Sequence, residues 1–285
     1  MRASWSLYRN SPHRFRNSGV LLAARSFVTA SWIPVMLLMA TFGCAPAQPP
    51  EAPARLPAWD GTVRQWGTLR QVMHGEIMDG QVHLADVIDK RHLFGIGAPH
   101  QLRGEILIAD SKAWVATTEG EQIVTRPGSA EDSAVFLAVA HVPRWIDVTV
   151  EQDISADEFD DFIERTMRQA GLDRLETIPF TVEGRFPSLK LHVLNGQCPF
   201  AEVTVKVAGA GPPHRTTLHD APGLLVGFYA ENGAGRITHH STRTHVHALV
   251  KNGDARVAGH VDAVTLKAGT VVRLPRGTYR NHPVR

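Results

Sequence analysis

The sequence has little cysteine: two residues, Cys44 and Cys198, in a chain of 285. Cys44 lies at the end of a candidate leader, so Cys198 has no partner for an intramolecular disulfide, and a disulfide framework is excluded. Hydrophobic residues make up 43% and charged residues 20% of the chain, as in soluble globular proteins. A chain of this length buries a sizeable core without cross-links.

The body of the chain also lacks an excess of positive charge. The formal net charge of +2 depends on residues 1–43, which carry five arginines and no acidic residue. The remaining residues hold 25 basic against 28 acidic side chains, a net charge of −3. A basic patch that would bind phosphates is not indicated, and we expect no nucleic-acid partner.

Only one long uncharged run is present, and it lies near the amino terminus. An arginine-rich stretch precedes "SFVTASWIPVMLLMATFGC" (26–44), and this order of basic, apolar and small residues is typical of a secretory signal. "TFGC" before "APAQPPEAPARLP" resembles the processing site of bacterial lipoproteins, although Phe42 is bulky for it. We expect an exported protein that is either periplasmic or anchored to the membrane only through a lipid on Cys44. An uncleaved membrane anchor is the alternative.

These features predict three parts of the chain. Residues 1–43 are a lipoprotein-type signal peptide, residues 44–60 a proline- and alanine-rich linker, and residues 61–285 the folded domain. The linker has too few large apolar side chains to build a core and is expected to be extended.

The folded domain is strand-rich by pattern. Runs of β-branched and aromatic residues between turn residues predict many strands and indicate an α+β fold with mixed or antiparallel sheets and few helices. The expected strands are 104–110, 112–118, 133–142, 145–150, 180–186, 189–194, 201–208, 223–230, 244–250, 255–266 and 269–275.

Two helices are expected. "SADEFDDFIERTMRQAG" (155–171) opens with a capping box formed by Ser155 and Glu158, and Gly171 stops it. Apolar residues from Phe159 to Ala170 fall on one face of this helix. A shorter helix is expected over residues 83–90.

Three histidines, His245, His247 and His260, form a candidate metal site that we call the histidine triad. In a strand, His245 and His247 project to the same side, about 7 Å apart at their Cα atoms. "KNGD" predicts a hairpin turn with Asn-Gly at its tip, and the returning strand carries His260 back alongside. Three neutral imidazoles are a standard set for a divalent transition ion with open positions for substrate.

The pattern alone leaves two interpretations open, because the chain holds 15 histidines. The triad could equally consist of ordinary strand histidines. A cupin barrel also uses His-x-His on a strand, but a cupin needs a glutamate where Lys251 or Asn252 stands here.

Three stretches in order resemble the alpha-acetolactate decarboxylase family. "FGIGAPHQLRGEILIADSKAWVATTEG" (94–120) is similar to its Gly-Ile-Gly-Thr and Asp-Gly-Glu block, and "GLLVGFYAENGAG" (223–235) to its Gly-Thr-Ile-Val-Gly-Phe stretch. "THVHALVKNGDARVAGHVDAV" (244–264) resembles its Tyr-His-Leu-His-Phe, turn, Gly-Gly-His-Val block. The resemblance covers residues 64–275.

The resemblance implies a zinc or other divalent metal ion held by the histidine triad, and a catalytic carboxylate at Glu105. It also implies decarboxylation of 2-acetolactate, a 2-hydroxy-3-oxo acid, to acetoin, and members of the family are often homodimers. The chemistry is consistent, because loss of CO2 leaves an enediolate that a Lewis acid stabilises and a carboxyl group then protonates. Without the resemblance, Glu105 is typical of a solvated carboxylate at a strand edge.

The sequence also departs from the family's pattern. Ala98 stands where the family has a threonine, and His192 where it has an arginine that meets the substrate carboxylate. A histidine binds a carboxylate only when protonated. The family's carboxy-terminal glutamate has no counterpart here, and the hairpin between His247 and His260 is two residues longer.

Three hypotheses follow. The protein is an exported metal-dependent acetolactate decarboxylase with an altered carboxylate pocket. Alternatively, it acts on another 2-hydroxy-3-oxo acid, or it is a lipid-anchored protein that binds a metal or ligand on the same scaffold without catalysis. Retention of Glu105 beside the histidine triad favours the first, whereas the replaced arginine and the lack of the family's carboxy-terminal tail favour the other two.

Overall fold

The computed structural model describes residues 56–88, 91–200 and 207–277. The chain divides into two units, Met1–Ala52 and Pro53–Arg285, and all described residues belong to the second. The expected signal peptide, Cys44 and most of the expected linker lie outside the described residues. No helix among the described residues is long and apolar enough to cross a membrane.

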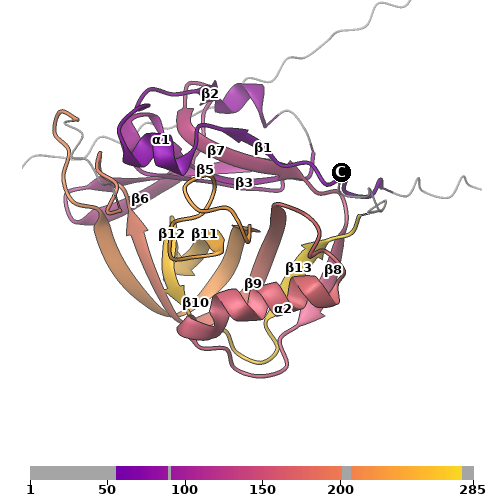
Figure 1. Cartoon of the computed structure of the whole chain (residues 1–285). Helices are drawn as coiled ribbons and strands as arrows, with labels where there is room; N and C mark the ends of the chain where they lie inside the picture. Colours follow the sequence, from indigo (N-terminus) through magenta and orange to yellow (C-terminus); the bar gives the residue numbers. More distant parts are fainter. Residues whose placement is uncertain (1–55, 89–90, 201–206, 278–285) are drawn as a thin grey trace, which may run out of the picture. The chain divides into compact units, whose positions relative to one another are not determined.

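The first antiparallel sheet has the strand order β1-β7-β3-β4-β5-β6, with β2 also paired to β7 (Figure 1). Short helical segments connect several of these strands: α1 (Leu69–Met73) and the 3-10 helices η1 (Leu84–Asp86) and η2 (His100–Leu102). The strands are β1 (Arg64–Trp66), β2 (Val82–His83), β3 (Leu93–Pro99), β4 (Glu105–Ala109), β5 (Lys112–Glu119), β6 (Gln122–Pro127) and β7 (Ser133–His141).

The second sheet has the order β10-β11-β12-β9-β13-β8, and an additional pairing between β10 and β9 closes part of it on itself. This closure is possible because β9 and β10 are long, 16 residues each, and take different neighbours along their length. The strands are β8 (Trp145–Thr149), β9 (Ile178–Val193), β10 (His214–Tyr229), β11 (Thr244–Asn252), β12 (Ala255–Val264) and β13 (Val271–Pro275).

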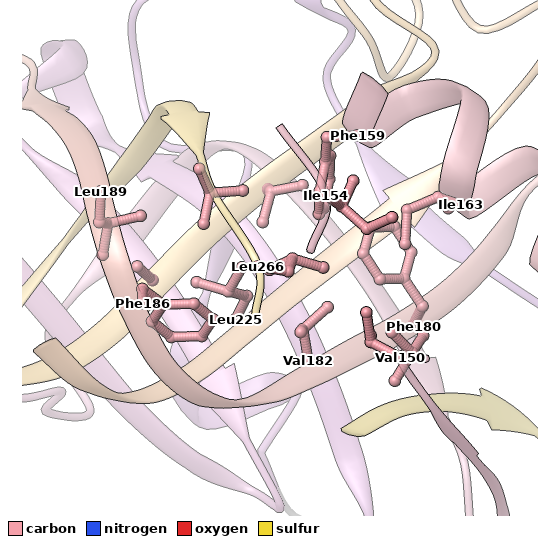
Figure 2. Packing of buried hydrophobic residues seen from close by; sticks show 14 of the residues in the cluster. Val150, Ile154, Phe159, Ile163, Phe180, Val182, Phe186, Leu189, Leu225 and Leu266 are labelled. Atoms are coloured by element: carbon pink, nitrogen blue, oxygen red, sulfur yellow. The ribbon is translucent and has the colours of Figure 1, made fainter. Parts of the chain in front are cut away.

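One hydrophobic core belongs to the second sheet. Figure 2 shows Phe180, Phe186 and Leu225 from β9 and β10 packed with Phe159 and Ile163 of the long helix. Alternate residues of β11, beginning with Val246, face this core, so its other residues, the histidines among them, face away.

A second core lies between the two sheets. Ile96 and Phe136 of the first sheet pack there with Val226 and Phe228 of the second. The outward face of β11 therefore points into the space between the sheets, where the candidate site is found.

The fold confirms the expected α+β, strand-rich class, and it confirms the long helix. Ser155 and Glu158 form a capping box around the 3-10 turn η3 (Ala156–Glu158), which continues into α2 (Phe159–Gln169). Gly171 follows with a φ of +71°, a left-handed conformation that favours glycine after a helix.

Several sequence predictions need correction. The helix expected over 83–90 is only the 3-10 turn η1. The strands expected at 180–186 and 189–194 are one strand, β9, which continues through Pro187. Proline has no amide hydrogen to donate, and Asp220, opposite it on β10, leaves the ladder with a φ of +53°. The expected strand 201–208 falls mostly outside the described residues.

The sequence did not predict the strands β1, β2, β3 and β6 or the short helices α1 and η2. The hairpin between β11 and β12 does form, but its two-residue tip is Gly253-Asp254, because Asn252 still pairs with Ala255. Gly253 has a φ of +60°, which suits the first position of such a tip.

Candidate metal centre

His245 and His247 are buried between the two sheets, with relative exposures of 4% and 1%. The Nδ1 atom of His247 lies 2.8 Å from the carbonyl oxygen of Ile106 on β4. The Nδ1 atom of His245 lies 2.8 Å from the carbonyl oxygen of Ile237, and its ring stacks on Phe136 of β7. Both imidazoles are therefore oriented by groups outside their own strand.

These two hydrogen bonds assign the tautomers, because a carbonyl oxygen only accepts and each Nδ1 must then carry the proton. In a neutral ring the Nε2 atom is left with a free lone pair. The Nε2 atoms of His245 and His247 lie 3.3 Å apart. Two nitrogen ligands about 2.0–2.1 Å from a tetrahedral ion are about 3.3–3.4 Å apart, so the pair has the geometry that a shared cation requires.

His260 completes the histidine triad. It lies directly opposite His247 in the β11–β12 ladder and opposite His192 in the β12–β9 ladder. The centroid of the His260 ring is 4.9 Å from that of His245 and 5.4 Å from that of His247. The structure thus brings the three rings together, while their role as metal ligands stays a prediction.

A fourth histidine, His239, was not singled out from the sequence. It lies in the segment between β10 and β11 and is buried, with an exposure of 9%. One ligand atom each of His239, His245 and His260 lie within 4.8 Å of one another. The signal in the sequence was the pair His239-His240 just before β11, but only the fold shows which of the two turns inward.

Glu105 begins β4 and is buried, with an exposure of 3%, so it is not a solvated carboxylate at a strand edge. Its Oε2 atom lies 3.5 Å from Nε2 of His247, and its Oε1 atom accepts a hydrogen bond of 3.3 Å from the amide of Leu194. Burial raises the pKa of Glu105 well above its usual range. A bound cation would oppose this shift.

His192 lies on β9 beside His260, with 4.5 Å between ring centroids. Its Nδ1 atom is 2.7 Å from Oδ1 of Asp262, whose Oδ2 accepts a 2.6 Å hydrogen bond from Arg215. Its Nε2 atom is 4.0 Å from Oε1 of Glu105. Asp262 was not expected from the sequence, because it sits in a bulge of β12, which strand alternation cannot anticipate.

Four of the buried imidazoles, those of His239, His245, His247 and His260, are neutral near pH 7. Burial lowers the pKa of His247 to about 3 and, together with the charge of His192, lowers the pKa of His239 to about 4. Burial and the neighbouring imidazoles also lower the pKa values of His245 and His260. Neutral imidazole is the form that binds metal ions.

A cavity of about 30 Å³ lies at the centre of these residues, lined by Glu105, His192 and the triad. It has room for one or two water molecules. A larger pocket of about 480 Å³ opens on the outer side and shares Phe200, His239 and His260 with it. Phe200, which is 43% exposed, packs on the ring of His239 with 4.3 Å between centroids.

One protein family matches most of the chain. The family model described as alpha-acetolactate decarboxylase matches residues 63–276. The chain belongs to the alpha-acetolactate decarboxylase family. The curated proteins that were compared with the sequence include no match.

Two solved structures have a fold similar to that of this chain. Alpha-acetolactate decarboxylase from Bacillus subtilis strain 168 is 18% identical, with a TM-score of 0.61, over 78% of this chain and 90% of the other. A Staphylococcus aureus protein of unknown function, described as similar to alpha-acetolactate decarboxylase, is 21% identical, with a TM-score of 0.57, over 76% of this chain and 85% of the other.

The described residues fit a divalent metal ion. The lone pairs of His245 and His247 face each other at 3.3 Å, an arrangement that is repulsive unless a cation lies between or beside them. The carboxyl group of Glu105 adjoins the same point. Histidine nitrogens with a carboxylate suit zinc and several other transition ions.

Proposed function

We propose that this chain is a metal-dependent decarboxylase that converts 2-acetolactate to acetoin. Family membership gives the class of reaction. The observation that carries the metal-dependent mechanism is the 3.3 Å contact between the Nε2 atoms of His245 and His247, both oriented by carbonyl oxygens. His260 is the third proposed ligand. A divalent ion bound there, zinc among the candidates, would supply positive charge where the substrate oxygens become negative as CO2 leaves.

Glu105 is proposed to deliver the proton that replaces CO2. Burial raises the pKa of this carboxyl group and so favours the protonated form that an acid needs, although a bound cation would oppose the shift. Its Oε2 atom lies 3.5 Å from a proposed metal ligand, so a substrate chelated at the centre would have its reacting carbon close to this carboxyl group. A positioned acid of this kind contributes typically 10²–10⁴-fold to the rate.

His192 is proposed to face the substrate with its Nε2 atom. Asp262 accepts the Nδ1 proton and is itself held by Arg215, so the imidazole cannot rotate freely. Since the resemblance places an arginine here in the family, we propose that this chain reads the substrate carboxylate differently from its relatives.

Two measurements on the purified full-length chain test the proposal: bound metal by elemental analysis, and release of acetoin and CO2 from racemic acetolactate. One equivalent of metal, and turnover that a chelator abolishes and added metal restores, is expected. His245→Ala should lose both, whereas His219→Ala, a change of an exposed histidine on β10, should lose neither. Turnover by metal-free protein would contradict the mechanism.

The small cavity favours a second candidate function. Its volume of about 30 Å³ is below that of the nine non-hydrogen atoms of acetolactate. The alternative is therefore a protein that binds a metal or ligand without catalysis, or one that acts on another 2-hydroxy-3-oxo acid. Stoichiometric metal without acetoin formation would favour this alternative.

Location is proposed from the sequence alone. We propose export and lipidation at Cys44, with the membrane reached only through that lipid, and a homodimer of the body. Mass spectrometry of the amino-terminal peptide tests the lipid, since an unmodified Cys44 within an uncleaved chain contradicts it. Light scattering measures whether the protein is a dimer.

A further inference from the structure

We propose that His239 is a fourth imidazole ligand of the metal centre, an inference that rests on the proposed metal site and extends it. His239 lies outside the strands that carry the triad, in the segment between β10 and β11. Backbone hydrogen bonds order this segment: the amide of Thr238 donates to the carbonyl oxygen of Gly233, and the amide of Thr242 to that of His239. The backbone on either side of His239 is therefore held in place.

The Nδ1 atom of His239 is buried and has no hydrogen-bond partner among the described residues. A buried polar atom that is left unpaired destabilises the folded state, so such an atom points to a missing partner. The hydroxyl of Thr238, the adjacent residue, is the other buried side-chain group in this state within the described ranges.

A metal ion is the partner that fits the surroundings of His239. One ligand atom each of His239, His245 and His260 fall within 4.8 Å of one another, and the ring centroids of His239 are 5.6 Å and 5.5 Å from those of His245 and His260. The ring of Phe200 accounts for the burial of His239, but it offers nothing to Nδ1.

A second group of possible metal ligands does not account for the unpaired nitrogen of His239. Atoms of His192, His260 and Asp262 are also close enough to hold an ion. However, Asp262 already binds His192 through one oxygen and Arg215 through the other, so its charge is neutralised within the protein. The unpaired nitrogen belongs to His239, which is in the group with His245 and His260. We therefore place the ion in that group.

A fourth imidazole changes the coordination of the centre. Four histidines would complete a tetrahedral set, as in structural zinc sites, whereas a six-coordinate ion would keep two positions for a chelating substrate. His239 lies between the inner cavity and the outer pocket, so it occupies the side from which a substrate would arrive.

The test uses Co²⁺ as the probe on the full-length chain after the native metal has been removed. His239→Ala should weaken Co²⁺ binding about tenfold or more, as measured by competition with a chelator, and change the visible absorption spectrum of the Co²⁺ protein. His240→Ala is the matched control, because its side chain is exposed in the same segment. It should leave both the affinity and the spectrum unchanged.

The outcomes separate this inference from the proposed function. If the wild-type chain binds no Co²⁺ and no zinc, the metal site itself is wrong. If the wild type binds Co²⁺ and His239→Ala matches it in affinity and spectrum, only the role of His239 is refuted. If the variant does not fold, X-ray absorption of the wild-type Co²⁺ protein counts the imidazoles directly. Four are expected, and three would refute the inference.

Discussion

Replacement of Glu105 by glutamine tests the proton donor without disturbing the fold. The amide has the shape of the carboxyl group and can still accept the 3.3 Å hydrogen bond from Leu194, but it has no acidic proton to give. Proton delivery by a positioned acid contributes about 10²–10⁴-fold, which is about 2.7–5.4 kcal/mol of the barrier at 1.36 kcal/mol for each factor of ten. We expect kcat for acetoin formation to fall by that factor.

The assay follows acetoin release at saturating acetolactate, with bound metal measured in the same sample. Glu119→Gln, which removes an exposed carboxylate at the end of β5, is the matched control and should retain full turnover. Turnover by Glu105→Gln equal to that of the wild type, at full metal content, would refute the assigned role.

Stability gives an independent check on Glu105. Because its folded pKa is raised, the buried carboxyl group contributes its full stability below the unfolded pKa of about 4.3. That contribution is lost as the pH rises toward the folded pKa. The metal-free glutamine variant should therefore lose less stability than metal-free wild type as the pH rises above about 4.3. Parallel urea-unfolding curves at all pH values would contradict the burial argument.

Four further predictions follow from the same geometry. Asp262→Asn removes the charge that holds His192, so kcat/KM should fall about tenfold while metal content is unchanged; loss of the metal would show a different role. Phe200→Ala uncovers His239 and should speed removal of metal by a chelator, with an unchanged rate as the contrary result. Phe186→Ala empties a fully buried position and should cost about 3–5 kcal/mol in urea unfolding, whereas a cost below about 1 kcal/mol would contradict its place in the core. In the folded protein His239 and His247 have pKa values of about 4 and 3, whereas in the unfolded chain a histidine has a pKa of about 6.5. Below that pH the unfolded state binds more protons, so the unfolding free energy of metal-free protein should decrease as the pH falls. Constant stability from pH 7 to 5 would refute this.

Local signals in the sequence were sufficient for several elements. The capping box of Ser155 and Glu158 predicted where the long helix begins, because it depends only on residues three apart. Likewise, the alternation of side chains in a strand placed His245 and His247 on one face. The short turn η1 was mistaken for a helix, because its apolar spacing fits both.

Longer-range features escaped the sequence. The long strand β9 was predicted as two strands on either side of Pro187, yet its partner strand tolerates the missing hydrogen bond because Asp220 leaves the ladder opposite it. Whether a proline ends a strand depends on the neighbouring strand, which lies more than 30 residues away in the chain.

The sequence by itself determined the strand-rich class, the family and the candidate triad, since each of these is carried by short runs of residues whose chemistry and spacing are local. Only the tertiary structure decided the surroundings of the triad. Glu105 on β4 and His239 in a connecting segment reach the triad because the two sheets pack face to face. Asp262, in a bulge of β12, reaches His192 beside them. Burial at that point, which keeps the imidazoles neutral and raises the pKa of Glu105, is a property of the packed sheets and of no single stretch of sequence.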